Sequence, residues 1–152
     1  MSEDDHARPL RLGQAAVPCD PDAPAAARAL MSRWLRGLGD AELRDNSRLL
    51  VSELVSNSVR HAGRPAGAAV LVEAFAIDGH VRVEVSDTGS GAVERREADE
   101  DGGFGLQLVE SIATRWGVSH ARGTLVWFEL PAGGHPASLL PVAEDRSAGP
   151  EG

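Results

Sequence analysis

A carboxylate and an amide stand four residues apart in the segment ELVSNSVRHA, residues 53–62. In a helix, Glu53 and Asn57 would be offset by only about 40° and would share one polar face. Magnesium prefers hard oxygen ligands, so the Asn57 amide oxygen is a candidate ligand. The Glu53 carboxylate is a candidate general base. The alternative is that this face is only the solvated side of an amphipathic helix.

An aspartate and two glycines form a second group in VEVSDTGSG, residues 83–91. Asp87 follows an alternating apolar segment, and its carboxylate could accept a hydrogen bond from an exocyclic amine. Gly89 and Gly91 would allow the backbone to approach a ligand closely. The alternative is an ordinary turn, because Asp-x-Gly is common in turns.

A third group is DGGFGLQLV, residues 101–109, in which Gly103 and Gly105 lead into an apolar segment with helical spacing. Free amides at the start of a helix can bind an anion. The alternative is a plain loop-to-helix junction. Two other phosphate motifs are excluded, because the chain has no lysine for a GxxxxGK[ST] loop and neither glycine group completes GxGxxG.

Apolar periodicity predicts the elements that must hold these groups in place. Asp78-Gly79 favours a type I′ turn between two strands. Trp34 and Trp127 are expected to pack in the core. The predicted helices cover residues 23–38, 41–61 with a break near 44–46, and 106–116, and the predicted strand pairs cover residues 68–77 with 80–86 and a hairpin over 117–130 that turns at Arg122-Gly123.

This order of elements predicts an α+β domain with helices on one face of a mostly antiparallel sheet. Residues 88–103 are glycine-rich and charged, and we expect a mobile loop there. We expect a flexible N-terminal arm over residues 1–20, with at most one edge strand, a single domain over 21–131 and a disordered tail over 132–152.

Composition narrows the classes of function. The net charge is −8 and all 15 basic residues are arginine, so a basic stripe for direct nucleic-acid binding is not expected. No apolar stretch approaches the roughly 20 residues of a membrane helix, and the first residues lack the apolar core of a secretory signal. Cys19 alone cannot form an intrachain disulfide. These features favour a cytoplasmic protein.

Together, the three segments resemble the N, G1 and G2 boxes of the histidine-kinase-like ATPase superfamily, which includes gyrase B, MutL and sensor kinases. ELVSNSVRHA, DTGSG, GGFGLQLVESIATRWG and GTLVWFEL are most similar to the short anti-sigma-factor serine/threonine kinases. The resemblance covers about residues 23–130. It implies a Bergerat fold, which is a two-layer α/β sandwich with a mobile lid over ATP.

The resemblance also implies a role for each site residue. Asn57 would coordinate the magnesium that bridges the phosphates, and Glu53 would be the general base. Asp87 would bind the adenine amine, with Thr124 nearby. The remaining nucleotide contacts are expected at Gly89, Gly91, Gly103, Gly105 and Leu106. His61 is assigned to packing or to a phosphate contact rather than to the role of phospho-acceptor.

Three functions remain open from the sequence. The first is a serine/threonine kinase that acts as an anti-sigma factor, with a sigma factor or its antagonist as the partner and homodimerisation left open. The second is a non-catalytic ATP-dependent protein-binding module, because the segment 92–101 is strongly acidic and would weaken triphosphate binding. The third is a scaffold in which the three boxes are accidental.

Overall fold

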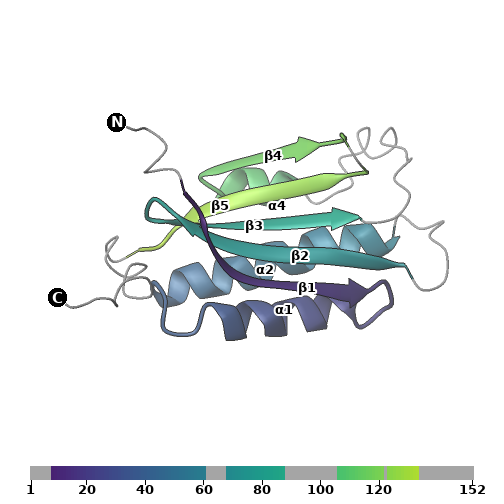
Figure 1. Ribbon diagram of the computed structural model, residues 1–152, viewed down its shortest axis with the longest axis horizontal. Coiled ribbons are helices and arrows are strands. Elements are labelled where there is room, and N and C mark those ends of the chain that lie inside the picture. The colour runs from purple at the N-terminus through teal and green to yellow at the C-terminus, as the bar shows by residue number, and fades with distance from the viewer. Residues whose placement is uncertain (1–7, 61–67, 88–105, 122, 134–152) are drawn as a thin grey trace.

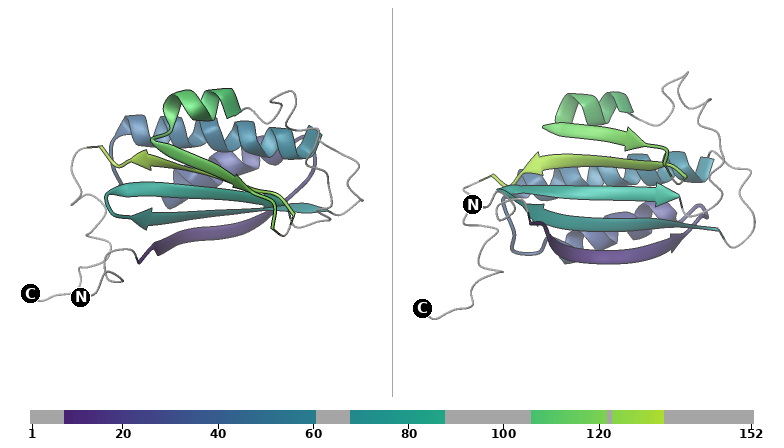
Figure 2. Two further views of the ribbon diagram at one scale, coloured as in Figure 1. Left: turned by 90° about the horizontal axis from the view of Figure 1, so that it is seen from above. Right: turned by 45° about the horizontal axis from the view of Figure 1, so that its top comes forward.

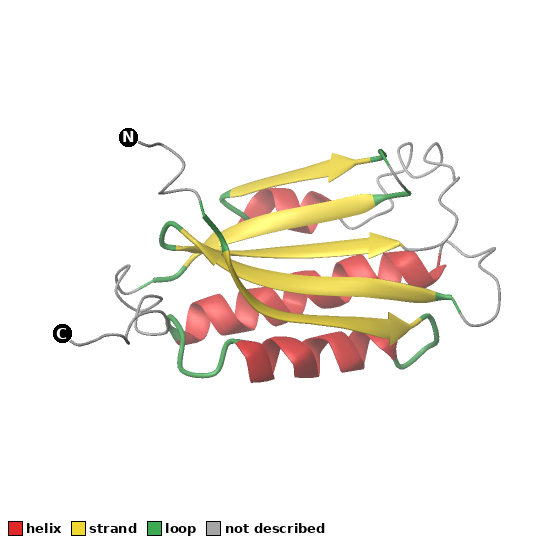
Figure 3. Ribbon diagram, viewed as in Figure 1, coloured by secondary structure: helices red, strands yellow, loops and turns green. Residues whose placement is uncertain are grey.

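The computed structural model describes residues 8–60, 68–87, 106–121 and 123–133 of the 152-residue chain. Within them the protein has two layers, a sheet and a set of helices on one face of it (Figures 1 and 3). The elements are β1 (Leu10–Pro18), α1 (Ala23–Trp34), α2 (Ala41–Arg60), β2 (Ala69–Ile77), β3 (His80–Asp87), α4 (Leu106–Ile112), β4 (Arg115–Ser119) and β5 (Leu125–Pro131).

The sheet has the strand order β1-β2-β3-β5-β4, and each neighbouring pair is antiparallel. β2 and β3 form a hairpin in which Asp78 and Gly79 have φ angles of 45° and 77°. Two consecutive positive φ angles are the signature of a type I′ turn. The predicted hairpin is therefore confirmed, as is the α+β architecture.

The core lies between the sheet and the helices. In β2 and β3, buried residues alternate with half-buried ones, so one side chain in two points toward the helices. α1 packs along α2 and beside β1, whereas α2 contacts β3, β5 and α4 (Figure 2). The largest fully buried side chains are Phe128, Met31, Leu35, Leu43, Leu50, Leu130, Val51, Val55, Val70, Val72, Val81 and Val83.

The helices differ in length from their predicted ranges. α1 ends at Trp34 and not at residue 38. α2 runs without a break, and its first turn is capped by Asp40, whose Oδ1 accepts the Leu43 amide at 3.0 Å. α4 ends at Ile112, because the next residues join the sheet: the Thr114 amide donates to the Glu129 carbonyl at 2.9 Å. Pairing with β5 overrides the helical periodicity.

Part of the expected N-terminal arm is an edge strand. Leu10–Pro18 forms β1, which pairs with β2 along most of its length. The expected arm therefore contains the one edge strand that the sequence analysis allowed for. Gly13 lies in β1 directly under the indole of Trp34, where a Cβ atom would overlap the ring. A glycine at this position lets α1 close onto the edge of the sheet.

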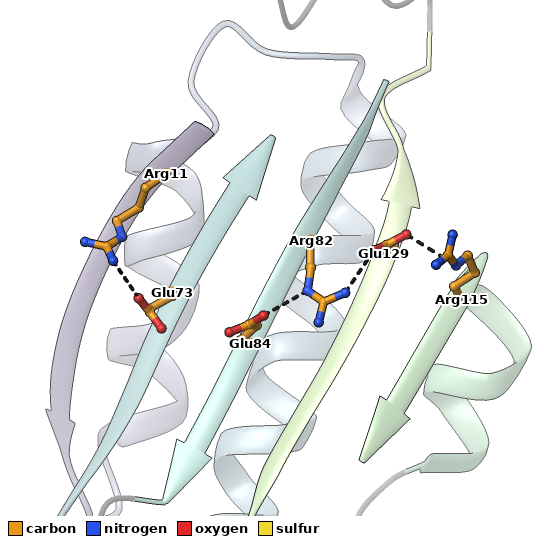
Figure 4. Close-up of polar contacts among 6 residues, drawn as sticks. All are labelled: Arg11, Glu73, Arg82, Glu84, Arg115 and Glu129. Atoms are coloured by element: carbon orange, nitrogen blue, oxygen red, sulfur yellow. Dashed lines mark hydrogen bonds and ion pairs between the residues drawn. The ribbon is translucent and has the colours of Figure 1, made fainter. Parts of the chain in front are cut away.

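The other face of the sheet carries ion pairs (Figure 4). Glu129 is buried and bridges two strands, with Oε2 at 3.1 Å from Arg82 Nη1 and Oε1 at 3.6 Å from Arg115 Nε. The Arg82 guanidinium also lies 3.9 Å from the centre of the Trp127 ring. The prediction that Trp127 packs in the core is therefore wrong. Trp127 is opposite Glu84 in the register, on the face away from the helices, whereas Trp34 does pack against the core.

Candidate functional site

Several element ends meet at one end of the sandwich. The last residues of α2 and β3 lie there, together with the first residues of β5 and, slightly further in, the start of α4 (Figures 1 and 2). This arrangement follows from the antiparallel order, since α2 and β3 both run toward this end and β5 runs away from it. Asp87 and Thr124 sit at these ends and Asn57 lies in the last turn of α2, whereas Glu53 lies about two turns before the end of that helix.

Asp87 is the last residue of β3, and a main-chain hydrogen bond fixes its position. Its amide donates to the carbonyl of Thr124 at 3.0 Å. Thr124 directly precedes β5, so two predicted contacts that are far apart in the sequence become neighbours. The alternation of β3 puts Asp87 on the same face as Val83 and Val85, which is the face covered by α2.

α2 supplies Glu53 and Asn57 from its C-terminal half. Asn57 is fully buried, whereas Glu53 is half-buried. Among the residues that the structure describes, no cation pairs with Glu53. A carboxylate without a resident counter-charge is available to a ligand or a reacting hydroxyl. Asn57 lies one turn nearer the end of the helix.

Leu106 is the first residue of α4 and is half-buried against the core. Val109, one turn later, is fully buried and anchors the helix to the sandwich. α4 also contacts α2, so the predicted anion-binding helix start is fixed relative to the helix of Glu53 and Asn57.

Five predicted residues lie outside the described part of the chain. They are His61, Gly89, Gly91, Gly103 and Gly105, and the acidic segment 92–101 lies there as well. Of the remaining predicted residues, Asp87 and Thr124 are joined by a hydrogen bond. Glu53 and Asn57 lie on α2, and Leu106 begins α4, which contacts α2. The main-chain link between Asp87 and Thr124 has no signal in the sequence, because it depends on the pairing of β3 with β5.

The donor set fits a magnesium ion that is held mainly by phosphate and water. No group of three or more His, Cys, Asp or Glu side chains that could hold a metal occurs in the described residues. A dedicated protein cage is therefore not found there, whereas one or two protein oxygens plus substrate phosphates are typical of magnesium. The amide oxygen of Asn57 and the carboxylate of Glu53 are oxygens of this type.

The described helices include none that is long and apolar enough to cross a membrane. The chain matches a family model described as "Histidine kinase-like ATPase domain" over residues 17–130. Comparison with curated proteins finds no match.

Among solved structures, the chain is similar to the crystal structure of the RsbU and RsbW domains of Rv1364c from Mycobacterium tuberculosis. The TM-score is 0.62 and the sequence identity is 23%. The match covers 82% of this chain and 32% of the other, so this chain spans about a third of that structure. At this level of identity the likeness concerns the fold.

Proposed function

Because the chain belongs to the histidine kinase-like ATPase domain family, we propose that it is a regulatory protein that binds ATP and magnesium at the end of the sandwich. The observation that carries the proposal is the hydrogen bond from the Asp87 amide to the Thr124 carbonyl. It holds an acid and a threonine side by side on the helix-covered face of the sheet. A polar pair of this kind can select a heterocycle that presents an amine donor.

Each described site residue has a proposed role in binding. The Asp87 carboxylate accepts a hydrogen bond from the adenine amine, and Thr124 contacts the same base. The amide oxygen of Asn57 binds magnesium, which when bound neutralises charge on the phosphates. The start of α4 at Leu106 lies toward the phosphate side. Gly89, Gly91, Gly103 and Gly105 remain proposals from the family resemblance.

We further propose that Glu53 accepts the proton of a hydroxyl on a protein partner while the hydroxyl oxygen bonds to the γ-phosphorus of ATP. The bond from that phosphorus to the β-phosphate oxygen breaks, and ADP leaves. In phosphoryl transfer the protein mostly positions groups and stabilises charge. A carboxylate with no ion-pair partner in the described part of the chain suits this role. The resemblance to anti-sigma-factor kinases makes a sigma factor or its antagonist the proposed partner and a cytoplasmic location the proposed setting.

Calorimetry with ATP and magnesium tests the binding site. We expect Asp87→Asn to abolish or strongly weaken binding, because the amide would present a donor or a weaker acceptor to the adenine amine. Asp78→Asn is the matched control. It makes the same chemical change at the other end of β3, where Asp78 is exposed in the hairpin turn. Equal affinity of the Asp87→Asn and wild-type proteins would refute the proposed site.

Radiolabelled ATP tests transfer separately from binding. We expect Glu53→Gln to retain ATP binding and to lose phosphorylation of the partner by at least about 100-fold, as removal of a general base does. Glu42→Gln, in the first turn of α2, is the control. Unchanged transfer by Glu53→Gln would exclude the base role.

The second candidate is a non-catalytic module in which ATP creates a surface for a partner. The acidic composition of residues 92–101 favours it, since seven residues there are charged and five of these are acidic. ATP-dependent partner binding that is identical in wild-type and Glu53→Gln proteins, with no transfer by either, would select this function.

A further inference from the structure

The outer surface of α1 is basic in a protein that is otherwise acidic. Residues 23–36 contain Arg28, Arg33 and Arg36 and no Asp or Glu, whereas the whole chain has a net charge of −8. All three arginines are exposed. Within the described residues, no carboxylate forms an ion pair with any of them. Arg28 and Arg33 on α1 and Arg36 two residues beyond its end are therefore solvent-exposed cations with no ion-pair partner in the described part of the chain.

Small side chains form a smooth strip on the same side of α1. Ala25, Ala29 and Ser32 are spaced by four and three residues, so they lie along one line on the helix surface. They are exposed, whereas Ala27 and Met31 on the opposite side are fully buried in the core. Small residues allow a second helix to approach closely.

α2 adds a fourth cation beside this strip. Arg48 Nη1 lies 3.5 Å from Ser32 Oγ, which places the guanidinium next to α1. Its ion pair with Asp45 is 2.7 Å long, but the Asp45 side chain is 66% exposed, and an exposed pair of this type contributes little. The other acids near α1 in sequence, Asp20 and Asp22, precede its first turn. Arg28, Arg33, Arg36 and Arg48 are called the arginine face below.

We propose that the arginine face docks an acidic helix of a partner protein. The carboxylates of the partner helix would pair with the arginines. Small residues on the same helix would rest on the strip formed by Ala25, Ala29 and Ser32. α1 has 12 residues and is about 18 Å long, which suits one short helix. An interface of this size is small, so the complex would be transient and sensitive to salt. The proposal concerns a surface away from the nucleotide site and does not depend on it.

Charge also argues for a helix over an extended polyanion. A membrane surface or a nucleic acid carries many charges over a long distance, so the net charge of −8 on the whole protein opposes its approach. A single helix interacts mainly with groups within a Debye length of about 8 Å. At that range the arginine face dominates.

The test uses a defined probe. The probe is a helical alanine peptide of about 18 residues with glutamates at positions i and i+4. The comparison peptide has lysines at the same positions. Fluorescence anisotropy with the full-length protein should show binding of the glutamate peptide that weakens as salt is added. Arg28→Ala, Arg33→Ala and Arg36→Ala combined should weaken this binding about tenfold, as the loss of three exposed ion pairs would.

The matched control removes two other arginines, Arg11→Ala with Arg115→Ala, which lie on the open face of the sheet. It should leave peptide binding unchanged. Circular dichroism and ATP binding report whether each variant is folded and whether its nucleotide site is intact. Replacement of Arg28, Arg33 and Arg36 by glutamate should transfer the preference to the lysine peptide.

The proposal is overturned if the wild-type protein does not bind the glutamate peptide, or if the control variant loses as much binding as the variant that lacks Arg28, Arg33 and Arg36. It is also overturned if vesicles of anionic phospholipid or duplex DNA bind through the same arginines more tightly than the peptide.

Discussion

Ser47 is a polar side chain placed where the core has no partner for it. It is fully buried in α2, and its Oγ makes no hydrogen bond with any described residue. A buried hydroxyl without a partner costs about 1–3 kcal/mol in lost hydration. Ser47→Ala should therefore raise the free energy of unfolding by about 1 kcal/mol, measured by urea denaturation.

Alanine also favours helix more than serine does, so the control must separate this effect. Ser52→Ala makes the same change in the same helix, where the Ser52 hydroxyl donates to the Leu49 carbonyl at 3.1 Å. We expect a clearly smaller gain for Ser52→Ala. Equal gains would mean that helix propensity, and not the buried hydroxyl, accounts for the effect.

The Glu129 carboxylate links three strands through ion pairs on the open face of the sheet. Glu129 of β5 is 5% exposed and contacts Arg82 of β3 and Arg115 of β4. β4 has no other strand partner than β5 among the described residues, so this bridge holds the first residue of the edge strand to the rest of the sheet. Arg82 and Arg115 are 24% and 67% exposed, and the contribution is reduced accordingly.

Glu129→Gln should lower the free energy of unfolding by about 1–2 kcal/mol, because Arg82 loses a charged hydrogen bond to a buried carboxylate and Arg115 loses an ion pair. The matched control is Glu73→Gln on the same face, where Glu73 forms an ion pair with one arginine, Arg11, which is 54% exposed. We expect the control to cost less than about half as much. Chemical denaturation at low and high salt measures both, and a larger loss in the control would contradict the assigned role of Glu129.

The whole molecule is a sandwich with its helices on one face and a charged sheet face on the other. Such a domain has a core of moderate size. A ligand that binds only the folded state should therefore raise its free energy of unfolding by a measurable amount. At about 100 times its dissociation constant, ATP with magnesium should add about 2.7 kcal/mol. For a domain of this size that is a rise in Tm on the order of 10 °C.

Nucleotide choice makes this prediction specific. GTP should produce a much smaller rise, because guanine has a carbonyl where adenine has the amine that we propose binds to Asp87. The rise with ATP should disappear in Asp87→Asn and persist in Asp78→Asn. Thermal denaturation measures all four cases, and an equal rise with GTP would show that Asp87 does not read the base.

Local patterns in the sequence are enough to predict most of the elements and to identify the candidate groups. Alternating valines predict β3, Asp78-Gly79 predicts the turn, and an amphipathic segment predicts α2, because each depends on neighbours within a few residues. The resemblance to the histidine-kinase-like ATPases extended these local features to a fold class, which the structure and the family match confirm.

The bounds of two strands and the positions of two side chains depend on contacts between residues that are distant in the sequence. Pairing with β5 converted the end of a predicted helix into β4, and pairing with β2 ordered Leu10–Pro18 as β1. The same long-range pairing brought Thr124 to Asp87 and turned Trp127 away from the core onto Arg82. These outcomes could not be read from local spacing, since strand order and register depend on how the whole sheet packs against its helices.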